Sequence, residues 1–218
     1  MSYDSVNRFI YVYDHEMNPH PWLTRKVVNV SLGIEPLPRN VLDLGCGNGA
    51  GTRLLVNAGF CVTGCDPEET AVAISRREIP DVHFEQIGVY DDPGHLGLER
   101  FDLVIAVDVV EHLFLPRALP CFVSKVLRPG GHFILTTPHY GHYFKNLVCS
   151  LLGRWDHQFA ALWDGGHVKF WSLQTITVLL EEAGFRIVAV ESGNRISPLL
   201  RFLWPNNMIV LAQKTPQL

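Results

Sequence analysis

The chain has 218 residues, of which 47% are hydrophobic and 18% are charged, and its formal net charge at pH 7 is −4. A chain of this size and composition is expected to fold as a globular protein around a core of its own, not to remain disordered. No run of lysine or arginine stands out, so we expect no nucleic-acid partner.

The cysteines and the N-terminal residues indicate the cellular compartment in which the protein is expected. Five cysteines are dispersed along the chain, and an odd, scattered set favours reduced thiols in the cytoplasm. Cys61 and Cys65 lack a second pair at zinc spacing, so we interpret both as strand residues. The first residues lack the basic start and apolar centre of a signal peptide, and no stretch reaches the ~18 apolar residues of a membrane span.

The predicted elements begin with a helix over residues 21–32, followed by a breaker, PLPRN. Beyond it, short apolar runs alternate with helical stretches. We expect strands over residues 41–45, 61–66, 83–87, 103–107, 132–137, 186–191 and 208–213. Helices are expected over residues 49–58, 68–76, 116–127 and 173–183. This alternation predicts an α/β fold with a doubly wound, mostly parallel sheet, and a hairpin-like return would make the last strand antiparallel.

A glycine-rich turn follows the first of these strands. Gly45, Gly47 and Gly49 alternate there, and glycines let a ligand approach the backbone at the start of a helix. The spacing also fits the dinucleotide pattern GxGxxG/A. Asp43 favours a ligand with a methionine moiety over a dinucleotide. An acid inside the strand would repel a phosphate group, but it can orient the α-amino group of methionine. The alternative is that Asp43 only bonds loop amides.

Asp66 ends the second strand, about 20 residues after the glycine turn, where an acid accepts both ribose hydroxyls of a bound nucleoside. It could instead cap the helix that follows Pro67, and the two roles can coexist.

Five segments, VLDLGCGNG, GCDPEE, FDLVIAVDVVEHL, LRPGGHFILTTP and LEEAGF, occur in an order and spacing that resembles class I S-adenosylmethionine-dependent methyltransferases. The resemblance covers roughly residues 38–214 and is closest in layout to ubiquinone-type small-molecule O-methyltransferases. It implies a Rossmann-like seven-stranded sheet with an antiparallel last strand. It also implies S-adenosylmethionine as cofactor and S-adenosylhomocysteine as product.

The resemblance also implies a set of cofactor contacts. The glycine turn would line the methionine and ribose, the end of the second strand the ribose and adenine, and the end of the fourth strand the reactive sulfonium. Many members carry an acid where this chain has Val89, so Tyr90 or Asp91 would substitute. The implied residues are Asp43, Gly45, Cys46, Gly47, Gly49, Asp66, Pro67, Glu68, Val89, Tyr90, Asp91, Val107 and Asp108.

Asp108, Glu111 and His112 fall at positions i, i+3 and i+4, on one face of a helix or turn. Similar E-x-x-E-H segments occur in quinone-pathway O-methyltransferases, some of which use a divalent metal, but here the first acid is the shorter Asp. The alternative is that Glu111 and His112 bond each other and cap the helix. We expect no metal and name these three as the candidates should one bind. The candidate catalytic residues are His112, His139 and His142.

Residues 138–171 form a long connection that is rich in aromatic and histidine residues, as suits a flat or lipophilic acceptor. For Phe170 and Trp171 we favour packing of this insertion onto the domain. The apolar patch over residues 143–153 could rest on a membrane surface or form a dimer interface. The N-terminus, which includes Tyr11, Tyr13, His15, His20, Trp22 and Arg25, is expected to close over the cofactor.

The function predicted is methyl transfer to a small molecule at a hydroxyl oxygen, by a monomer or homodimer. The chain lacks the N/D-P-P-Y/F signature of amide and base N-methylation, yet N- or C-methylation of a metabolite stays open. A nicotinamide-dependent oxidoreductase is disfavoured by Asp43 and a missing Tyr-x-x-x-Lys, and a non-catalytic cofactor-binding protein is a further alternative. The expected organisation is one methyltransferase domain over residues 1–218, with a lid and helix (1–37), a cofactor-binding half (38–137), a substrate-side insertion (138–171) and a C-terminal helix with strands (172–218).

Overall fold

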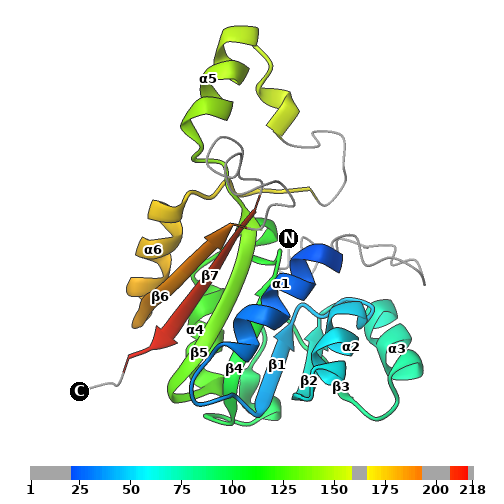
Figure 1. Ribbon diagram of the computed structural model, residues 1–218. Helices are drawn as coiled ribbons and strands as arrows, with labels where there is room; N and C mark the ends of the chain where they lie inside the picture. The colour runs from blue at the N-terminus through cyan, green and yellow to red at the C-terminus, as the bar shows by residue number, and fades with distance from the viewer. Residues whose placement is uncertain (1–20, 159–165, 193–206, 216–218) are drawn as a thin grey trace.

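The computed structural model describes residues 21–158, 166–192 and 207–215 (Figure 1). Its strands form one seven-stranded sheet in the order β3-β2-β1-β4-β5-β7-β6. Strand β7 pairs antiparallel with both β5 and β6, and the other pairs are parallel. The strands are β1 (Asn40–Leu44), β2 (Cys61–Asp66), β3 (His83–Gln86), β4 (Phe101–Val107), β5 (Leu127–Pro138), β6 (Phe185–Ser192) and β7 (Asn207–Lys214). The predicted fold class is therefore confirmed.

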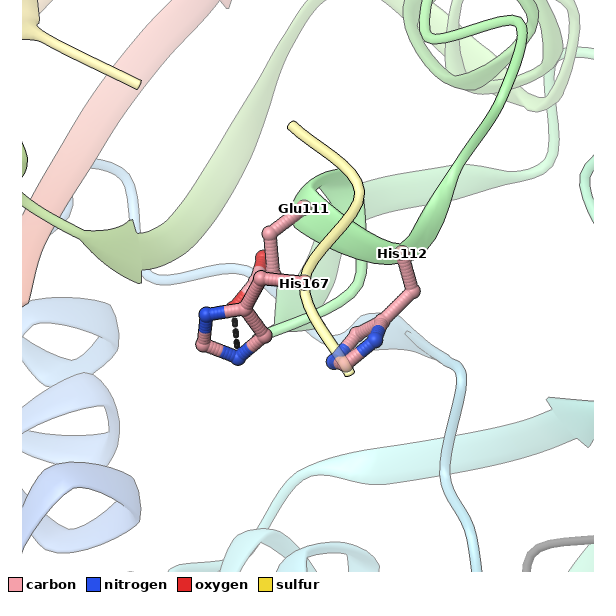
Figure 2. A group of neighbouring side chains, drawn as sticks. All are labelled: Glu111, His112 and His167. Carbon is pink, nitrogen blue, oxygen red and sulfur yellow. Dashed lines mark ion pairs between the residues drawn. The ribbon is translucent and has the colours of Figure 1, made fainter. Parts of the chain in front are cut away.

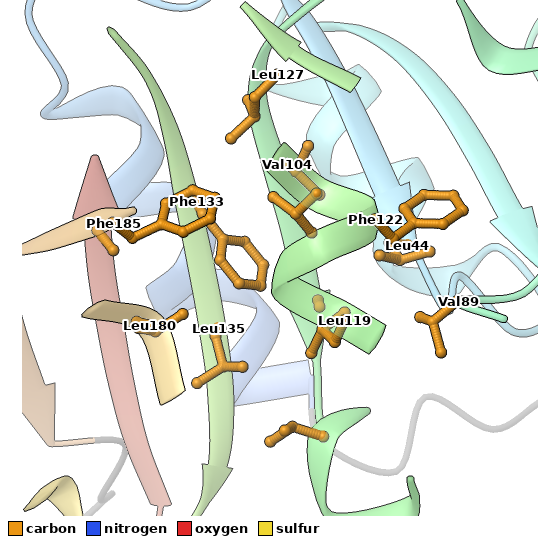
Figure 3. Close-up of a cluster of buried hydrophobic side chains, with 14 of the residues drawn as sticks. Leu44, Val89, Val104, Leu119, Phe122, Leu127, Phe133, Leu135, Leu180 and Phe185 are labelled. Carbon is orange, nitrogen blue, oxygen red and sulfur yellow. The ribbon is translucent and has the colours of Figure 1, made fainter. Parts of the chain in front are cut away.

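Helices cover both faces of this sheet because the central strands are apolar on both sides. On one face, α1 (Pro21–Leu32) and α2 (Ala50–Asn57) pack on the strands through Leu23, Val27 and Leu55. On the other, α4 (Ala118–Val126) and α6 (Leu173–Glu181) pack around Phe133 and Phe185 (Figure 3). Helix α3 (Glu69–Glu78) lies against β2 and β3. The two clusters hold the sheet rigid, which fixes the loops at its ends.

The expected boundaries shift where a backbone constraint intervenes. The first strand ends at Leu44, since Gly45 has a φ of 79°. The helix expected to reach residue 127 ends at Val126, and β5 begins at Leu127 instead of at residue 132. Pro129 explains this shift, because a residue before proline is driven out of the helical region.

The long connection after β5 contains a helix that the sequence patterns did not predict. Helix α5 (Tyr143–Leu152) is followed by a 3₁₀ turn, η4 (Trp155–Gln158). Figure 1 shows α5 standing away from the sheet, beyond the end of β5. None of the helices in the described part of the chain is long and apolar enough to cross a membrane.

Strands β1, β2, β4 and β5 are parallel, so their carboxyl ends meet at one edge of the sheet. The glycine turn follows β1, a short 3₁₀ turn η3 (Val110–His112) follows β4, and the insertion follows β5. A second 3₁₀ turn, η2 (Pro93–Leu96), lies between β3 and β4. In open α/β sheets this edge is where ligands bind.

Candidate functional site

The glycine turn is held in a shape that only glycine fits. Gly45 N–H and Cys46 N–H both donate to the carbonyl of Cys65, at 2.8 and 3.0 Å. A Cβ on Gly45 would lie 2.6 Å from a Val109 methyl carbon, and Gly45 has a positive φ. From α3, the Ser75 hydroxyl donates to Gly47 O at 2.8 Å. Hydrogen bonds to β2 and α3 therefore fix the turn, and Val109, which follows β4, lies against it.

Asp43 lies in β1 just before this turn and is 5% exposed. Its Oδ2 accepts a 2.6 Å hydrogen bond from the hydroxyl of Thr52 in α2. Burial raises the pKa of Asp43 to about 6. The hydrogen bond from Thr52 opposes this rise, and the negative charge of Asp66 adds to it. A carboxylate that is this poorly solvated gains from a cationic ligand group.

Asp66 is buried at the end of β2 and contacts the glycine turn directly. Its Oδ2 accepts from Gly47 N–H and its Oδ1 from Glu68 N–H, both at 2.9 Å. Burial raises its pKa, and the two amide donors oppose that shift. The residue that caps α3 is Glu68, through Thr70 N–H. Asp66 thus joins the turn to the start of α3 without being the helix cap.

Asp108 follows β4 with a φ of 54°, an uncommon conformation for a residue with a side chain. Its backbone N–H donates to the hydroxyl oxygen of Thr136 in β5 at 3.0 Å, and the same hydroxyl donates to its Oδ1 at 2.7 Å. The amide of Asn207 in β7 donates to the same Oδ1 at 3.3 Å. Three strands therefore hold the carboxylate at the carboxyl edge.

Next to Asp108, Glu111 is fully buried in η3. Among the described residues, neither of its carboxylate oxygens has a hydrogen-bond partner at full bonding geometry, although the Thr137 hydroxyl lies near enough to oppose the rise in its pKa. Burial first, and then the charge of Asp108, raise the pKa of Glu111 well above its usual range. Figure 2 shows His112 and His167 beside this carboxyl group. His167 Nε2 lies 4.0 Å from Glu111 Oε1.

The two ends of the insertion meet over η3. His139 and Trp171 form a parallel bridge, and Tyr140 N–H donates to Trp171 O at 2.8 Å. The Tyr140 hydroxyl lies 2.6 Å from His167 Nδ1. Burial raises the pKa of Tyr140 to about 12, with contributions from the acids at positions 111 and 108. The insertion thus brings a tyrosine and a histidine to the carboxyl edge.

Comparisons with known proteins agree on one family. The family described as "Methyltransferase domain" matches residues 13–190 of this chain. A ubiquinone biosynthesis O-methyltransferase from Methylobacterium sp. is 35% identical over 178 residues, which is 77% of this chain and 68% of that protein. A protein of the same name from Aromatoleum aromaticum is 30% identical over 149 residues, or 64% of this chain and 58% of that protein.

Among solved structures, magnesium protoporphyrin IX methyltransferase from Synechocystis, which contains S-adenosylhomocysteine, has a TM-score of 0.64 at 20% identity. The match covers 88% of this chain and 82% of that one. The chain belongs to the class I S-adenosylmethionine-dependent methyltransferases. Family and cofactor are thus as the sequence motifs predicted, and the chain spans 58% to 68% of the length of the two curated relatives.

The structure brings most of the predicted cofactor residues of this methyltransferase to one edge. Val89 is buried beneath the loop after β3, where it joins the core. Tyr90 is 38% exposed, and its hydroxyl accepts from Leu115 N–H. The side chain of Asp91 accepts from Gly88 N–H at 2.7 Å and so closes its own turn. Their contact with adenine stays a prediction.

The predicted catalytic histidines fall into two places. His112 lies beside His167, with ring centroids 5.0 Å apart. His139 and His142 form a second pair, 6.4 Å apart. His142 caps α5 through Lys145 N–H, whereas His139 Nδ1 is buried without a hydrogen-bond partner among the described residues. Burial lowers the pKa of His139, and His142 adds to that shift.

The possible metal ligands that the structure brings together differ by one residue from the three named from the sequence. The donor atoms that lie within 4.8 Å of one another belong to Glu111, His112 and His167, and Asp108 is not part of this group. Asp108 is instead turned toward β5 and β7 by its contacts with Thr136 and Asn207.

Other expectations have mixed outcomes. Trp171 is buried, as expected for a packing residue, and Phe170 is 52% exposed but stacks edge-on against Tyr140. All five cysteines are free, and Cys61 and Cys65 lie in β2. Burial raises the pKa of Cys46 well above its usual value, so its thiol is neutral. Most of the predicted N-terminal lid lies in residues 1–20, outside the described residues.

Proposed function

We propose that this protein transfers the methyl group of S-adenosylmethionine to a hydroxyl oxygen of a small aromatic or lipophilic acceptor. The observation that carries the proposal is the pairing of two elements at one sheet edge. One is a glycine turn flanked by the buried acids Asp43 and Asp66. The other is an insertion whose Tyr140 and His167 reach that edge. Relatives named as O-methyltransferases support oxygen as the methylated atom.

On this proposal, the cofactor lies across the ends of β1, β2 and β4. Asp43 would hold the α-amino group of the methionine moiety, and Asp66 the ribose hydroxyls, with Pro67 and Glu68 beside the adenine. Asp66 already accepts two backbone N–H bonds, and a carboxylate has about four lone-pair sites, so two remain for the ribose. Val107 and Asp108 would lie nearest the sulfonium.

Methyl transfer requires little covalent chemistry from the protein, because the sulfonium is already electrophilic. The acceptor oxygen attacks the methyl carbon, the bond from carbon to sulfur breaks, and the hydroxyl proton must leave. His139 is the best-supported proton acceptor of the predicted histidines. Its lowered pKa keeps the imidazole neutral at pH 7, its ring is partly exposed, and it directly follows β5. The products are S-adenosylhomocysteine and a methyl ether.

A lipid surface is the proposed partner of the insertion. On α5 and just after it, the apolar side chains that are at least 41% exposed are Tyr143, Phe144, Leu147, Leu151, Leu152 and Trp155. Lys145 and Arg154 flank this apolar face, as in helices that lie in a membrane interface. Flotation with anionic liposomes should recover the wild type but not a Leu151→Asp, Leu152→Asp variant. Equal recovery of both, or of neither, would contradict the contact.

The experiment that tests the proposed function is titration calorimetry with S-adenosylhomocysteine on the wild type and on Asp66→Ala. We expect micromolar binding by the wild type. In Asp66→Ala we expect a loss of ~10²-fold, because hydrogen bonds to a charged group contribute about 1.5–3 kcal/mol each. Asp92→Ala is the matched control, because this acid accepts from Gly94 N–H in an exposed loop. A folded wild type that does not bind would refute the proposal.

The acceptor atom needs a second measurement. Radiolabelled S-adenosylmethionine would be offered with a panel of phenols and with their amine analogues. Label should enter the phenols and not the amines. Label in the amines alone would overturn oxygen as the methylated atom while leaving the cofactor assignment intact.

A further inference from the structure

The two outer strands of the sheet, β3 and β6, differ in how their free edges are protected (Figure 1). Strand β3 has four residues, and its exposed His83 pairs with Glu85 at 2.8 Å. Strand β6 has eight residues and exposes Val188, Ala189 and Val190 in succession. A long apolar edge strand is a template for pairing with another chain, so proteins usually shorten such an edge or place charges on it. Strand β3 follows that rule, and β6 does not.

Within the described residues, β6 has a neighbouring strand on one side only, which is β7. Strand β7 is buried along most of its length. In β6, by contrast, Val188 is 49% exposed and Val190 is 43% exposed. The outer side of β6 thus combines a free strand edge with apolar side chains that are exposed to solvent.

An irregularity in β6 brings its two charged residues to the same face of the sheet. In a regular strand, residues five apart point to opposite faces. The pairing of β6 with β7 shifts by one residue in the middle of the strand, as at a β-bulge. Arg186 therefore lies opposite Gln213 and Glu191 opposite Ile209, which are four apart in β7 and share a face. Arg186 and Glu191 thus project from one face.

We propose that β6 pairs with the β6 strand of a second copy of this chain, antiparallel, about a two-fold axis between Val188 and Ala189. In this register, Arg186 lies directly opposite Glu191 of the partner subunit, on the same face of the joined sheet. The two-fold symmetry repeats this contact, so an ion pair lies on each side of the axis. The strand is its own electrostatic complement, which favours a second copy over a different protein as the partner.

The other face of β6 fits the same register. Ile187 and Val190 lie opposite Ala212 and Val210 of β7, which belong to the core on the α6 side. Across the axis, Ile187 faces Val190 of the partner subunit, and each covers apolar surface of the other. A shift of the register by one residue in either direction would separate the opposite charges. One register therefore satisfies both faces.

The two charged side chains are available for this contact. Both are exposed, and neither forms an ion pair with another described residue. The guanidinium of Arg186 makes only a long hydrogen bond, to Gln213 Oε1 at 3.4 Å. Pairing with a second copy would supply each charge with a partner of opposite sign.

The proposed interface is separate from the proposed cofactor site. Strands β5 and β7 lie between β6 and the strands β4, β1 and β2, at whose ends the cofactor is proposed to bind. Pairing through β6 therefore goes beyond the proposed function and does not depend on it. Substitutions in β6 should leave the affinity for S-adenosylhomocysteine unchanged.

The test is sedimentation equilibrium of the full chain over a range of protein concentrations, in which we expect the wild type to form a dimer. Arg186→Glu and Glu191→Arg should each raise the dimer dissociation constant by ~10-fold or more, because two attractive pairs become two repulsive pairs at once. The double variant Arg186→Glu, Glu191→Arg should restore the dimer. An equimolar mixture of the two single variants should form a heterodimer, since each supplies the charge that the other lacks.

Glu85→Arg is the matched control, because it reverses a charge on the opposite edge strand, and it should leave the dimer intact. Leu151→Asp, Leu152→Asp tests α5, the other surface where a dimer was expected, and should also dimerise. A wild type that is monomeric at every concentration would overturn the proposal. So would a dimer that persists in both single variants, or one that the α5 variant loses.

Thermal unfolding checks that each variant is folded, and titration with S-adenosylhomocysteine is measured on the same samples. Loss of cofactor binding in every chain, with the dimer intact, would refute the proposed function and leave the pairing of β6 in place. Loss of the dimer with cofactor binding intact is the result expected for the two single variants.

Discussion

The glycine turn and the insertion occupy the same edge of the sheet but are built in different ways. The turn is held by backbone groups and buried acids: Gly45, Cys46 and Gly47 are each bonded to β2 or to its last residue, Asp66. These contacts all lie within the core of the domain, between strands and helices that pack from both faces.

The described residues of the insertion make few contacts with the rest of the domain and expose much of their surface. Its ends are joined at His139 and Trp171, but α5 between them exposes most of its apolar side chains. The polar groups that it offers at the edge are chiefly the side chains of Tyr140 and His167, since its backbone amides there already bond to Glu111 and Trp171. Side chains can be exchanged without altering the fold, whereas a backbone turn cannot.

The difference indicates how the two binding tasks are divided. The cofactor is common to the whole family, and the part proposed to bind it is inseparable from the fold. The acceptor differs between enzymes, and the part proposed to bind it is attached to the fold at two points. Mutations on the two sides should therefore affect different measurements.

The largest expected effect lies on the insertion side. His139→Asn should reduce kcat by ~10²–10⁴-fold, the usual contribution of a positioned base, and leave the affinity for S-adenosylhomocysteine unchanged. Because burial lowers the pKa of His139, the acid limb of the wild-type rate profile should lie below the ordinary histidine value of about 6.5. Steady-state kinetics across pH, with cofactor titration, measure both.

His132 provides the matched control for this variant. It lies in β5, the strand that His139 directly follows, six residues before the end of that strand, and its pKa is also lowered by burial. His132→Asn should leave the rate unchanged. Equal losses in the two variants would mean that the effect comes from β5 as a whole, and His139 would then have no special role.

The next effect lies on the cofactor side. Gly45→Ala adds a Cβ at 2.6 Å from Val109 and forces an L-residue to a φ of 79°. We expect about 1–3 kcal/mol of lost stability from the strained conformation, with a further loss from the collision. Binding of S-adenosylhomocysteine should be lost as the turn is displaced. Thermal unfolding and calorimetry measure the two effects.

Gly59→Ala separates strain from collision. Gly59 has a φ of 95° in the turn after α2, and no atom lies within 4 Å of its added Cβ. This variant should lose stability only through the strained backbone conformation, and it should bind the cofactor normally. In the double variant Gly45→Ala, Val109→Ala the collision is removed, so part of the affinity should return. If Gly59→Ala also lost cofactor binding, the turn would not be the local determinant proposed here.

The same division explains which elements could be predicted. Helix α1 was expected at its observed bounds, and the strands at β1 and β2 within one residue, because apolar runs and glycine signals are local. Helix α5 was not expected, although Gly153 ends it with a φ of 62°. Its apolar residues are largely exposed, so the segment was interpreted as a surface patch and its helical spacing was not used.

In the candidate site, too, the residues beside the glycine turn could be predicted, whereas the position of His167 beside Glu111 could not. Asp43 and Asp66 were predicted from their places relative to the glycines, and the structure buries both beside the turn. His167 was missing from the predicted metal candidates, because its approach to Glu111 depends on two backbone bonds between distant segments. The signal available was the segment GHVKF, but no spacing rule links it to the residues after β4.

The smallest effect is the pH dependence of cofactor binding through Asp43. Its pKa is raised to about 6 in the folded protein without ligand. If its carboxylate holds the amino group of the cofactor, affinity levels off well above pH 6 and falls as the pH drops through that value. At pH 5, one unit lower, S-adenosylhomocysteine should bind ~10-fold more weakly. Titration calorimetry from about pH 5 to about pH 8 measures the midpoint.

Two variants assign that midpoint to Asp43, which is needed because the pKa of Asp66 is raised as well. Thr52→Val removes the hydrogen bond that lowers the pKa of Asp43, so the midpoint should move to higher pH. Asp43→Asn should bind weakly at every pH and lack this transition. The fold itself should respond with the opposite sign: an acid whose pKa is raised on folding costs stability as the pH rises from 3.8 toward 6. A wild-type affinity that stays flat across this range would mean that Asp43 serves the turn through Thr52 and does not contact the cofactor.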